Sequence, residues 1–411
     1  MGTVKVTVLD PGGGGTPAVG AKVVFINPDN TLVKQVATDT AGKAEAVVMI
    51  GASVTSIALI SPTNYSLQTV IGVKPGDDLI LGTKNRDFTQ VGQMTFTYPA
   101  VFNAVQYEIS TPCGYQSVPV PATGATGTAA VMFYSYCKQD TMEVVFVAVD
   151  KDGNALQSIH KTGVAYASGG TVALTTPEAA RSFTSSYTNI NPAVTGISLI
   201  RAVPDGAGVR NSASVAGPGT TAALSLVGGI ASAARIETIA QNADGSNQRV
   251  RQTIGGSAAT YGLDVGATLL PWLAPPSFDA TTGKLVVPVD TTGTTMAAPD
   301  LFRISARFSR ADAAGVFTSY SWLLFAPNAA DLALPVLPAE VGVPMPNATD
   351  SVFATDSMIE LDTMAGYDAV RHDLNATYEL YVGERQPPAT VRISLSPGRQ
   401  LPTASASDVA R

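Results

Sequence analysis

Short segments with alternating apolar and polar residues recur along this chain of 411 residues, separated by clusters of Gly, Pro, Asn and Asp. The first such segment, TVKVTVLD, places Val4, Val6 and Val8 on one face, which is the pattern of a half-buried strand. NPDN at Asn27–Asn30 and TAGK at Thr40–Lys43 are typical turn sequences. Strands bounded by turn signals every ~8–12 residues predict β-sandwich domains.

The first of these domains carries a family-like pattern. Residues 15–48 read GTPAVGAKVVFINPDNTLVKQVATDTAGKAEAVV, which resembles the carboxypeptidase-regulatory-like, transthyretin-like β-sandwich. The matching positions are Pro17, Gly20-Ala21, Val23, Thr38-Asp39 and Gly42-Lys43. The resemblance implies an accessory module without catalytic residues, of a kind common in secreted and surface proteins of bacteria.

We expect an all-β chain of tandem sandwiches. Domains usually hold about 100–200 residues, so a chain of this length predicts several. The first domain is predicted at 1–85 and an immunoglobulin- or fibronectin-like sandwich at 86–176. A larger, irregular β-rich region follows at 177–400, which is either one sandwich or two, and 401–411 is predicted as a flexible tail. A short helix is expected within 355–374.

Charge excludes one class of partner. Charged residues make up 14% of the chain and the net charge is −7, without a basic run. A protein that binds a phosphate backbone needs clustered Lys and Arg, so we expect no nucleic-acid partner. No apolar stretch reaches the ~20 residues of a membrane helix, so we expect no transmembrane span.

The compartment is inferred from the start of the chain and from the resemblance. Met1 and Gly2 lead directly into a strand, without the apolar core of a signal peptide. A cytosolic start and a removed export signal both agree with this. The resemblance of residues 15–48 favours the second, so we expect an extracellular or cell-surface protein.

No catalytic motif is present in the sequence. The two histidines are interpreted as structural, His160 as a solvent-facing residue of a strand and His372 as part of a polar cluster. No nucleophile elbow or zinc-protease motif accompanies them. Scattered Cys and His do not form a zinc pattern. Acidic residues at Asp77, Asp78, Asp362 and Asp368 are candidate Ca²⁺ ligands, because carboxylates close in sequence can share a cation. We expect a non-enzymatic protein.

Trp272 is a candidate platform for a ligand. It lies in the proline-rich segment LLPWLAPPSF, and an exposed indole ring in a loop can stack on a sugar. Trp322, within SYSWLLFAP, is predicted to lie in the core. Two carboxylates in a cleft would hydrolyse glycosides, but the sequence neither favours nor excludes such a pair.

Cys113 and Cys137 are the chain's two cysteines. A disulfide is the favoured interpretation, with two buried thiols as the alternative, because a zinc site needs more ligands and a redox pair usually reads C-x-x-C. Closing a loop of about 25 residues stabilises a fold by roughly 3–4 kcal/mol. Such a bond also requires an oxidising compartment.

These patterns predict a secreted or cell-surface bacterial protein with a structural, adhesive or assembly role. Its expected partners are other surface proteins, further copies of itself, or glycans. The alternative is a carbohydrate-binding or carbohydrate-active protein with its site in the C-terminal region.

Overall fold

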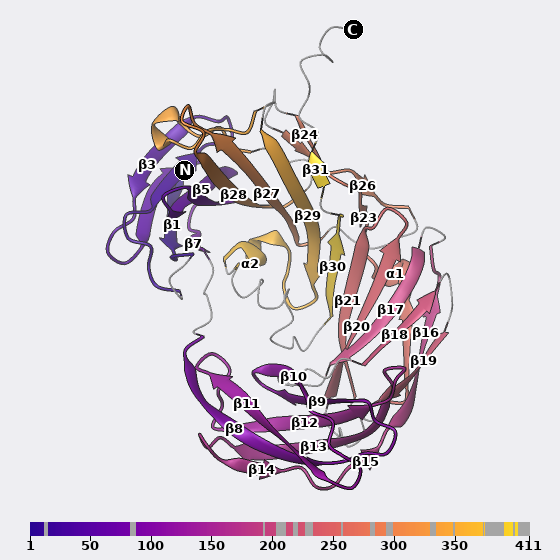
Figure 1. Ribbon diagram of the computed structural model, residues 1–411. Coiled ribbons are helices and arrows are strands. Elements are labelled where there is room, and N and C mark those ends of the chain that lie inside the picture. The colour runs from indigo at the N-terminus through magenta and orange to yellow at the C-terminus, as the bar shows by residue number, and fades with distance from the viewer. Residues whose placement is uncertain are drawn as a thin grey trace.

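A computed structural model of the chain contains almost only strands. It describes residues 1–11, 15–82, 88–191, 194–202, 211–216, 221–226, 233–255, 258–279, 284–292, 299–328, 334–347, 350–372, 374, 390–397 and 399–401. The all-β fold class expected from the sequence is confirmed (Figure 1). The predicted tail, 401–411, lies outside the described residues except for Leu401.

The first sandwich has two sheets. One runs in the order β4-β1-β7, and the other contains β3, β2, β5 and β6 as neighbours. The bounds are β1 (Gly2–Val8), β2 (Lys22–Ile26), β3 (Leu32–Ala37), β4 (Lys43–Val48), β5 (Ala52–Ser61), β6 (Asn64–Val73) and β7 (Asp78–Leu81). Val4, Val6 and Val8 are buried between the sheets, as their alternation predicts.

The middle sandwich pairs a five-stranded sheet, β10-β9-β12-β13-β15, with a three-stranded sheet, β11-β8-β14. Large aromatic side chains fill its core, among them Phe96, Tyr98 and Phe146. Its strands are β8 (Gln90–Pro99), β9 (Gln106–Thr111), β10 (Gly114–Val118), β11 (Thr126–Tyr134), β12 (Thr141–Val149), β13 (Ala155–Ala165), β14 (Thr171–Ala173) and β15 (Glu178–Ala179).

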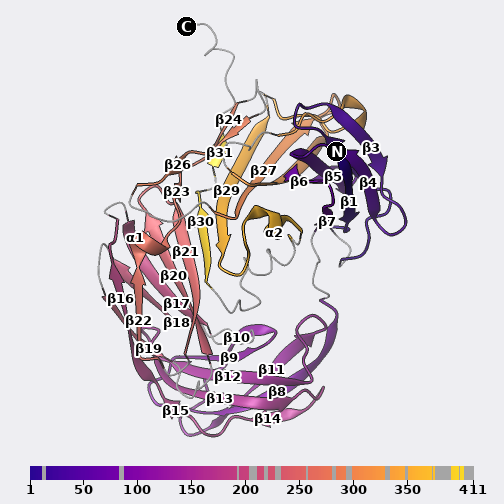
Figure 2. The same ribbon diagram turned by 180° about the vertical axis from the view of Figure 1, so that it is seen from behind.

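A third sandwich begins the C-terminal region. The three-stranded sheet β19-β16-β22 lies opposite the strands β18, β17, β20 and β21. The elements are β16 (Arg181–Thr188), β17 (Val194–Ala202), β18 (Asn211–Ala216), β19 (Thr221–Leu226), β20 (Ala233–Asn242), β21 (Asn247–Gly255), β22 (Thr260–Asp264) and the short helix α1 (Val265–Thr268). Both views place the middle sandwich beside this third sandwich, away from the first (Figures 1 and 2).

One long sheet connects the first sandwich to the third. Its strand order is β18-β17-β20-β21-β30-β29-β27-β28-β6-β5-β2-β3, with β31 paired to β29. The connecting strands are β27 (Leu301–Ala311), β28 (Phe317–Ala326), β29 (Ser351–Leu361), β30 (Val391–Leu395) and β31 (Arg399–Leu401). Strand β28 runs parallel to β6, from Ser319 opposite Asn64 to Phe325 opposite Val70.

Two apolar clusters cover the two faces of this sheet. On one face, β1, β4, β7 and the helix α2 (Tyr367–His372) enclose a core that includes Phe25, Val70 and Ile359. The other face carries Trp322 and Met358 and is covered by residues 270–279, 284–287 and 334–345. The covering elements are β23 (Trp272–Leu273), β24 (Ser277–Asp279), β25 (Lys284–Val286), β26 (Val289–Asp290) and the 3-10 helix η3 (Ala339–Val341).

The domain boundaries near residues 85, 176 and 400 stay predictions. The β6–β28 pairing adds that the predicted first domain and the C-terminal region contribute to the same sheet and core. The helix expected within 355–374 is α2, but it is shorter than that range because β29 occupies the first part of it.

Candidate functional site

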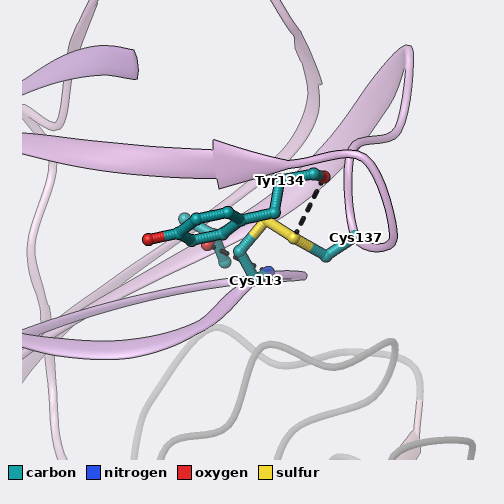
Figure 3. The surroundings of a disulfide bond; sticks show 4 residues. Cys113, Tyr134 and Cys137 are labelled. Carbon is teal, nitrogen blue, oxygen red and sulfur yellow. Dashed lines mark hydrogen bonds between the residues drawn. A yellow bond between two sulfur atoms is a disulfide. The ribbon is translucent and has the colours of Figure 1, made fainter. Parts of the chain in front are cut away.

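Cys113 and Cys137 form a disulfide between the two sheets of the middle sandwich (Figure 3). Cys113 lies in the turn from β9 to β10, and Cys137 follows the end of β11. Their Cα atoms are 5.0 Å apart. The Tyr134 carbonyl oxygen accepts hydrogen bonds from the backbone N–H groups of Cys137, at 3.1 Å, and Lys138, at 2.9 Å. The bond therefore fixes the chain where β11 ends.

A partly exposed aromatic cluster, formed by Phe88, Tyr134 and Tyr136, lies beside this disulfide. Phe88 is 63% exposed and meets Tyr136 edge-on, with ring centroids 4.9 Å apart. The rings of Tyr134 and Tyr136 are nearly parallel, at 15° and 6.1 Å. The sequence FYSY at residues 133–136 is interpreted as core or edge packing. Phe133 is fully buried, whereas Tyr134 and Tyr136 are half-buried.

Asp77 and Asp368, two of the Ca²⁺ candidates, meet around a buried arginine. The Arg371 guanidinium donates two hydrogen bonds to the Asp77 carboxylate, from Nε at 2.8 Å and from Nη2 at 2.9 Å. It also pairs with Asp368, which accepts a further bond from Lys74. The bonds from Lys74 and Arg371 lower the pKa of the Asp368 carboxyl. These carboxylates are thus already neutralised by cationic side chains.

The two other Ca²⁺ candidates lie elsewhere. Asp78 is exposed on β7, and Asp362 pairs with Arg392, which also binds Glu360. Burial alone would raise the pKa of Asp362, but the Arg392 guanidinium lowers it below its ordinary value. Within the described part of the chain, no three His, Cys, Asp or Glu side chains gather where a metal ion could bind.

Trp272 is not an exposed platform, so that expectation was wrong. Its side chain is 4% exposed and packs with Tyr187, Tyr261 and Leu269 in the core of the third sandwich. The flanking prolines suggested a loop, but Trp272 and Leu273 form β23, which pairs with β26. Trp322 is fully buried, as predicted, and its indole N–H donates to Thr69 Oγ1 at 2.9 Å.

The histidines lie far apart. His160 on β13 has its Nε2 3.0 Å from Glu143 Oε2 on β12, with only 6% of its side chain exposed. It does not face solvent as its strand position suggested. His372 ends α2, with its Nε2 3.5 Å from Asp77 Oδ1. No helix in the described ranges has both the length and the apolar character needed to cross a bilayer.

No protein-family model and no curated protein matches the chain. Solved structures that resemble it include the TIE protein of Bacillus anthracis, at 13% identity and a TM-score of 0.16, with 64% of this chain and 50% of that chain covered. The shaft pilin SpaA of Lactobacillus rhamnosus GG is 12% identical, with a TM-score of 0.15 and coverages of 42% and 97%.

The major pilin subunit BcpA of Bacillus cereus is 11% identical, with a TM-score of 0.15 and coverages of 64% and 98%. The match to the TIE protein spans about half of that protein's length. TM-scores this low describe no common superposition of whole chains, so we argue the function from the chain's own residues.

Proposed function

We propose that this chain is an exported, non-enzymatic bacterial protein that acts at the cell surface, in a structural or adhesive role, through its β-sandwich units. The Cys113–Cys137 disulfide carries this proposal. Disulfides persist in oxidising compartments and are rare in the cytosol. A covalent link between two sheets also suits a protein exposed to proteases and to mechanical load.

The joined framework of the molecule supports a structural role. The first sandwich and the C-terminal region share the β6–β28 pairing, and the buried Asp77–Arg371 ion pair crosses the same junction. Strand pairing and buried ion pairs both resist separation of the parts they join.

The carbohydrate alternative relied on an exposed Trp272, and this side chain is buried. Stacking on a sugar requires an exposed ring face, and Trp272 is enclosed by the core of the third sandwich. We therefore do not propose a glycan site in the C-terminal region.

Thiol trapping on producing cells tests the export proposal. Intact cells are treated with a membrane-impermeant protease, and a second sample is lysed in acid and alkylated with a maleimide. We expect external proteolysis of the chain and no alkylation of Cys113 or Cys137 until a reductant is added. A protein that is protease-protected in intact cells and alkylated at both thiols contradicts the proposal. The double variant Cys113→Ser/Cys137→Ser has no thiol and shows how much the maleimide modifies other groups.

A further inference from the structure

Strand β11 is an edge strand with an unusual surface. It is the outer strand of the sheet β11-β8-β14, and its nine residues, TGTAAVMFY, carry no charge. Alternate side chains are exposed, at Thr126, Thr128, Ala130 and Met132, while those between them are buried. The strand therefore presents a regular row of small or apolar side chains along a sheet edge.

Three observations show which backbone groups of β11 face away from β8. Thr126 lies opposite Pro99, which has no N–H, so these two residues form a non-hydrogen-bonded pair. The preceding residue, Ala125, accepts a bond from Ala100 N–H on the β8 side. The Ala130 carbonyl accepts a bond from Gln116 Nε2 of β10, at 3.1 Å. Because hydrogen-bonded pairs alternate, the backbone groups of Thr128, Ala130 and Met132 point outward.

Most of these outward groups have no partner within the described part of the chain. The Gln116 amide is the one contact found there, and it occupies only the Ala130 carbonyl. The N–H groups of Thr128, Ala130 and Met132 thus lie in a row with the spacing that an added strand requires.

Except for β10, which is also uncharged but has only five residues, the other edges of the first and middle sandwiches carry the usual protection against strand addition. Charged side chains, prolines, bulges and short lengths all discourage it. Strand β3 carries Lys34, β4 carries Lys43 and Glu45, and β7 carries Asp78. Strand β14 has three residues and β15 has two. In β11 the one irregularity lies at the end, between Phe133 and Tyr134.

We propose that β11 pairs antiparallel with β11 of a second copy of this chain, centred on Ala130. This pairing rests on the proposed function, because it gives the assembly role a specific contact. Two three-stranded sheets would then form one continuous sheet of six strands. Thr128 of one copy lies opposite Met132 of the other, so every pair is uncharged.

A second copy supplies a strand that matches β11 in charge, because both strands are uncharged. The net charge of −7 makes two copies repel each other over most approaches. A two-fold pairing of β11 brings together the same uncharged strand from both copies and so avoids this repulsion. In the single chain Gln116 covers the Ala130 carbonyl, and it must swing aside when the copies pair.

Sedimentation velocity of the full-length chain over a range of concentrations tests the pairing. We expect a dimer whose fraction rises with concentration. Ala130→Pro removes an outward N–H that makes no bond to β8, so the sandwich should fold and dimerisation should weaken at least about tenfold. Ala130→Lys places two like charges opposite each other at the centre of the pairing and should weaken it similarly. Gln116→Ala, which uncovers the Ala130 carbonyl, should strengthen it.

Val47→Lys on β4 is the matched control, because Val47 is also exposed on an edge strand. It should leave dimerisation unchanged, and near-ultraviolet circular dichroism with the oxidised mass shows that each variant is folded. A chain that stays monomeric throughout, or a dimer that Ala130→Pro and Ala130→Lys leave intact, overturns the pairing. A monomer that is still surface-exposed and disulfide-bonded overturns the pairing alone, whereas a cytosolic, reduced protein overturns the proposed function.

Discussion

At the scale of single residues, Asp356 has the least compensated environment among the described carboxylates. It lies on β29, 3% exposed, with Ala354 and Met358 of the apolar cluster on the same face. Ser396 Oγ donates to its Oδ1, while Oδ2 has no partner in the described ranges. Burial raises the pKa of Asp356 from an ordinary value of 3.8 to about 7.

Asp356→Asn should remove a pH-dependent loss of stability. Between pH 3.8 and about 7 the folded chain keeps this proton and the unfolded chain releases it. The folded state is therefore destabilised as pH rises, by up to about 1.4 kcal/mol per unit. Asn carries no charge at any of these pH values, so its burial costs the same throughout. Relative to wild type, the free energy of unfolding of the variant should therefore rise by about 2–4 kcal/mol from pH 4 to pH 8. Urea unfolding followed by tryptophan fluorescence measures the difference, and parallel pH profiles would refute it.

The role of a single residue could be inferred from the sequence only where few interpretations were possible. Two cysteines in one sandwich could form one bond, and they do. Trp272 was misjudged because the prolines around it describe the local backbone and not what packs over it. The partner of Asp77 is Arg371, 294 positions away, and no local pattern connects two such residues.

At the scale of elements, the position of α2 depends on the buried ion pair. The helix has six residues, too few to be stable alone, so tertiary contacts must hold it. Arg371 joins it to Asp77 in the turn before β7, and the Tyr367 hydroxyl donates to the carbonyl oxygens of Ile71 and Phe325. Helix α2 thus bridges the first sandwich and the long sheet.

Arg371→Met should destabilise the folded chain by about 3–5 kcal/mol, because it leaves the Asp77 carboxylate buried without its partner. The double variant Asp77→Asn/Arg371→Met removes both charges and should recover a large part of that loss. Chemical denaturation of the two variants and the wild type measures this. Asp78→Asn, on an exposed neighbouring carboxylate, is the control and should change stability by less than about 0.5 kcal/mol. Equal losses in the single and double variants would mean that the charges do not matter.

Strands were more accessible to sequence reasoning than their partners. Alternation at Val4, Val6 and Val8 predicts β1 correctly, because the two faces of a strand experience different surroundings. The parallel pairing of β6 with β28 joins segments about 250 residues apart, as in Trp322 opposite Leu67. Alternation specifies which face of a strand is buried but not which strand lies beside it. The pairing of β6 with β28 could therefore not be predicted.

At the scale of the whole molecule, the long sheet joins segments that are far apart in the sequence. The units that share a core therefore do not follow the order of the chain. The first sandwich shares an apolar cluster with β28, β29 and β30, whereas the middle sandwich has its own core. Residues that share a core usually unfold together. We therefore expect the first sandwich and the C-terminal strands to behave as one cooperative unit, and the middle sandwich as another.

Val70→Ala and Val144→Ala distinguish these units, because both side chains are fully buried and lose the same two methyl groups. Val70 lies on β6, where this strand pairs with β28, and Val144 lies in the core of the middle sandwich. Each change should cost about 1–3 kcal/mol. In amide hydrogen exchange, Val70→Ala should speed exchange in β5, β6, β27 and β28 together and leave β9 and β12 unchanged, while Val144→Ala does the reverse. If Val70→Ala loosens only β1–β7, the shared sheet does not couple the two ends of the chain, and the first sandwich is an independent domain.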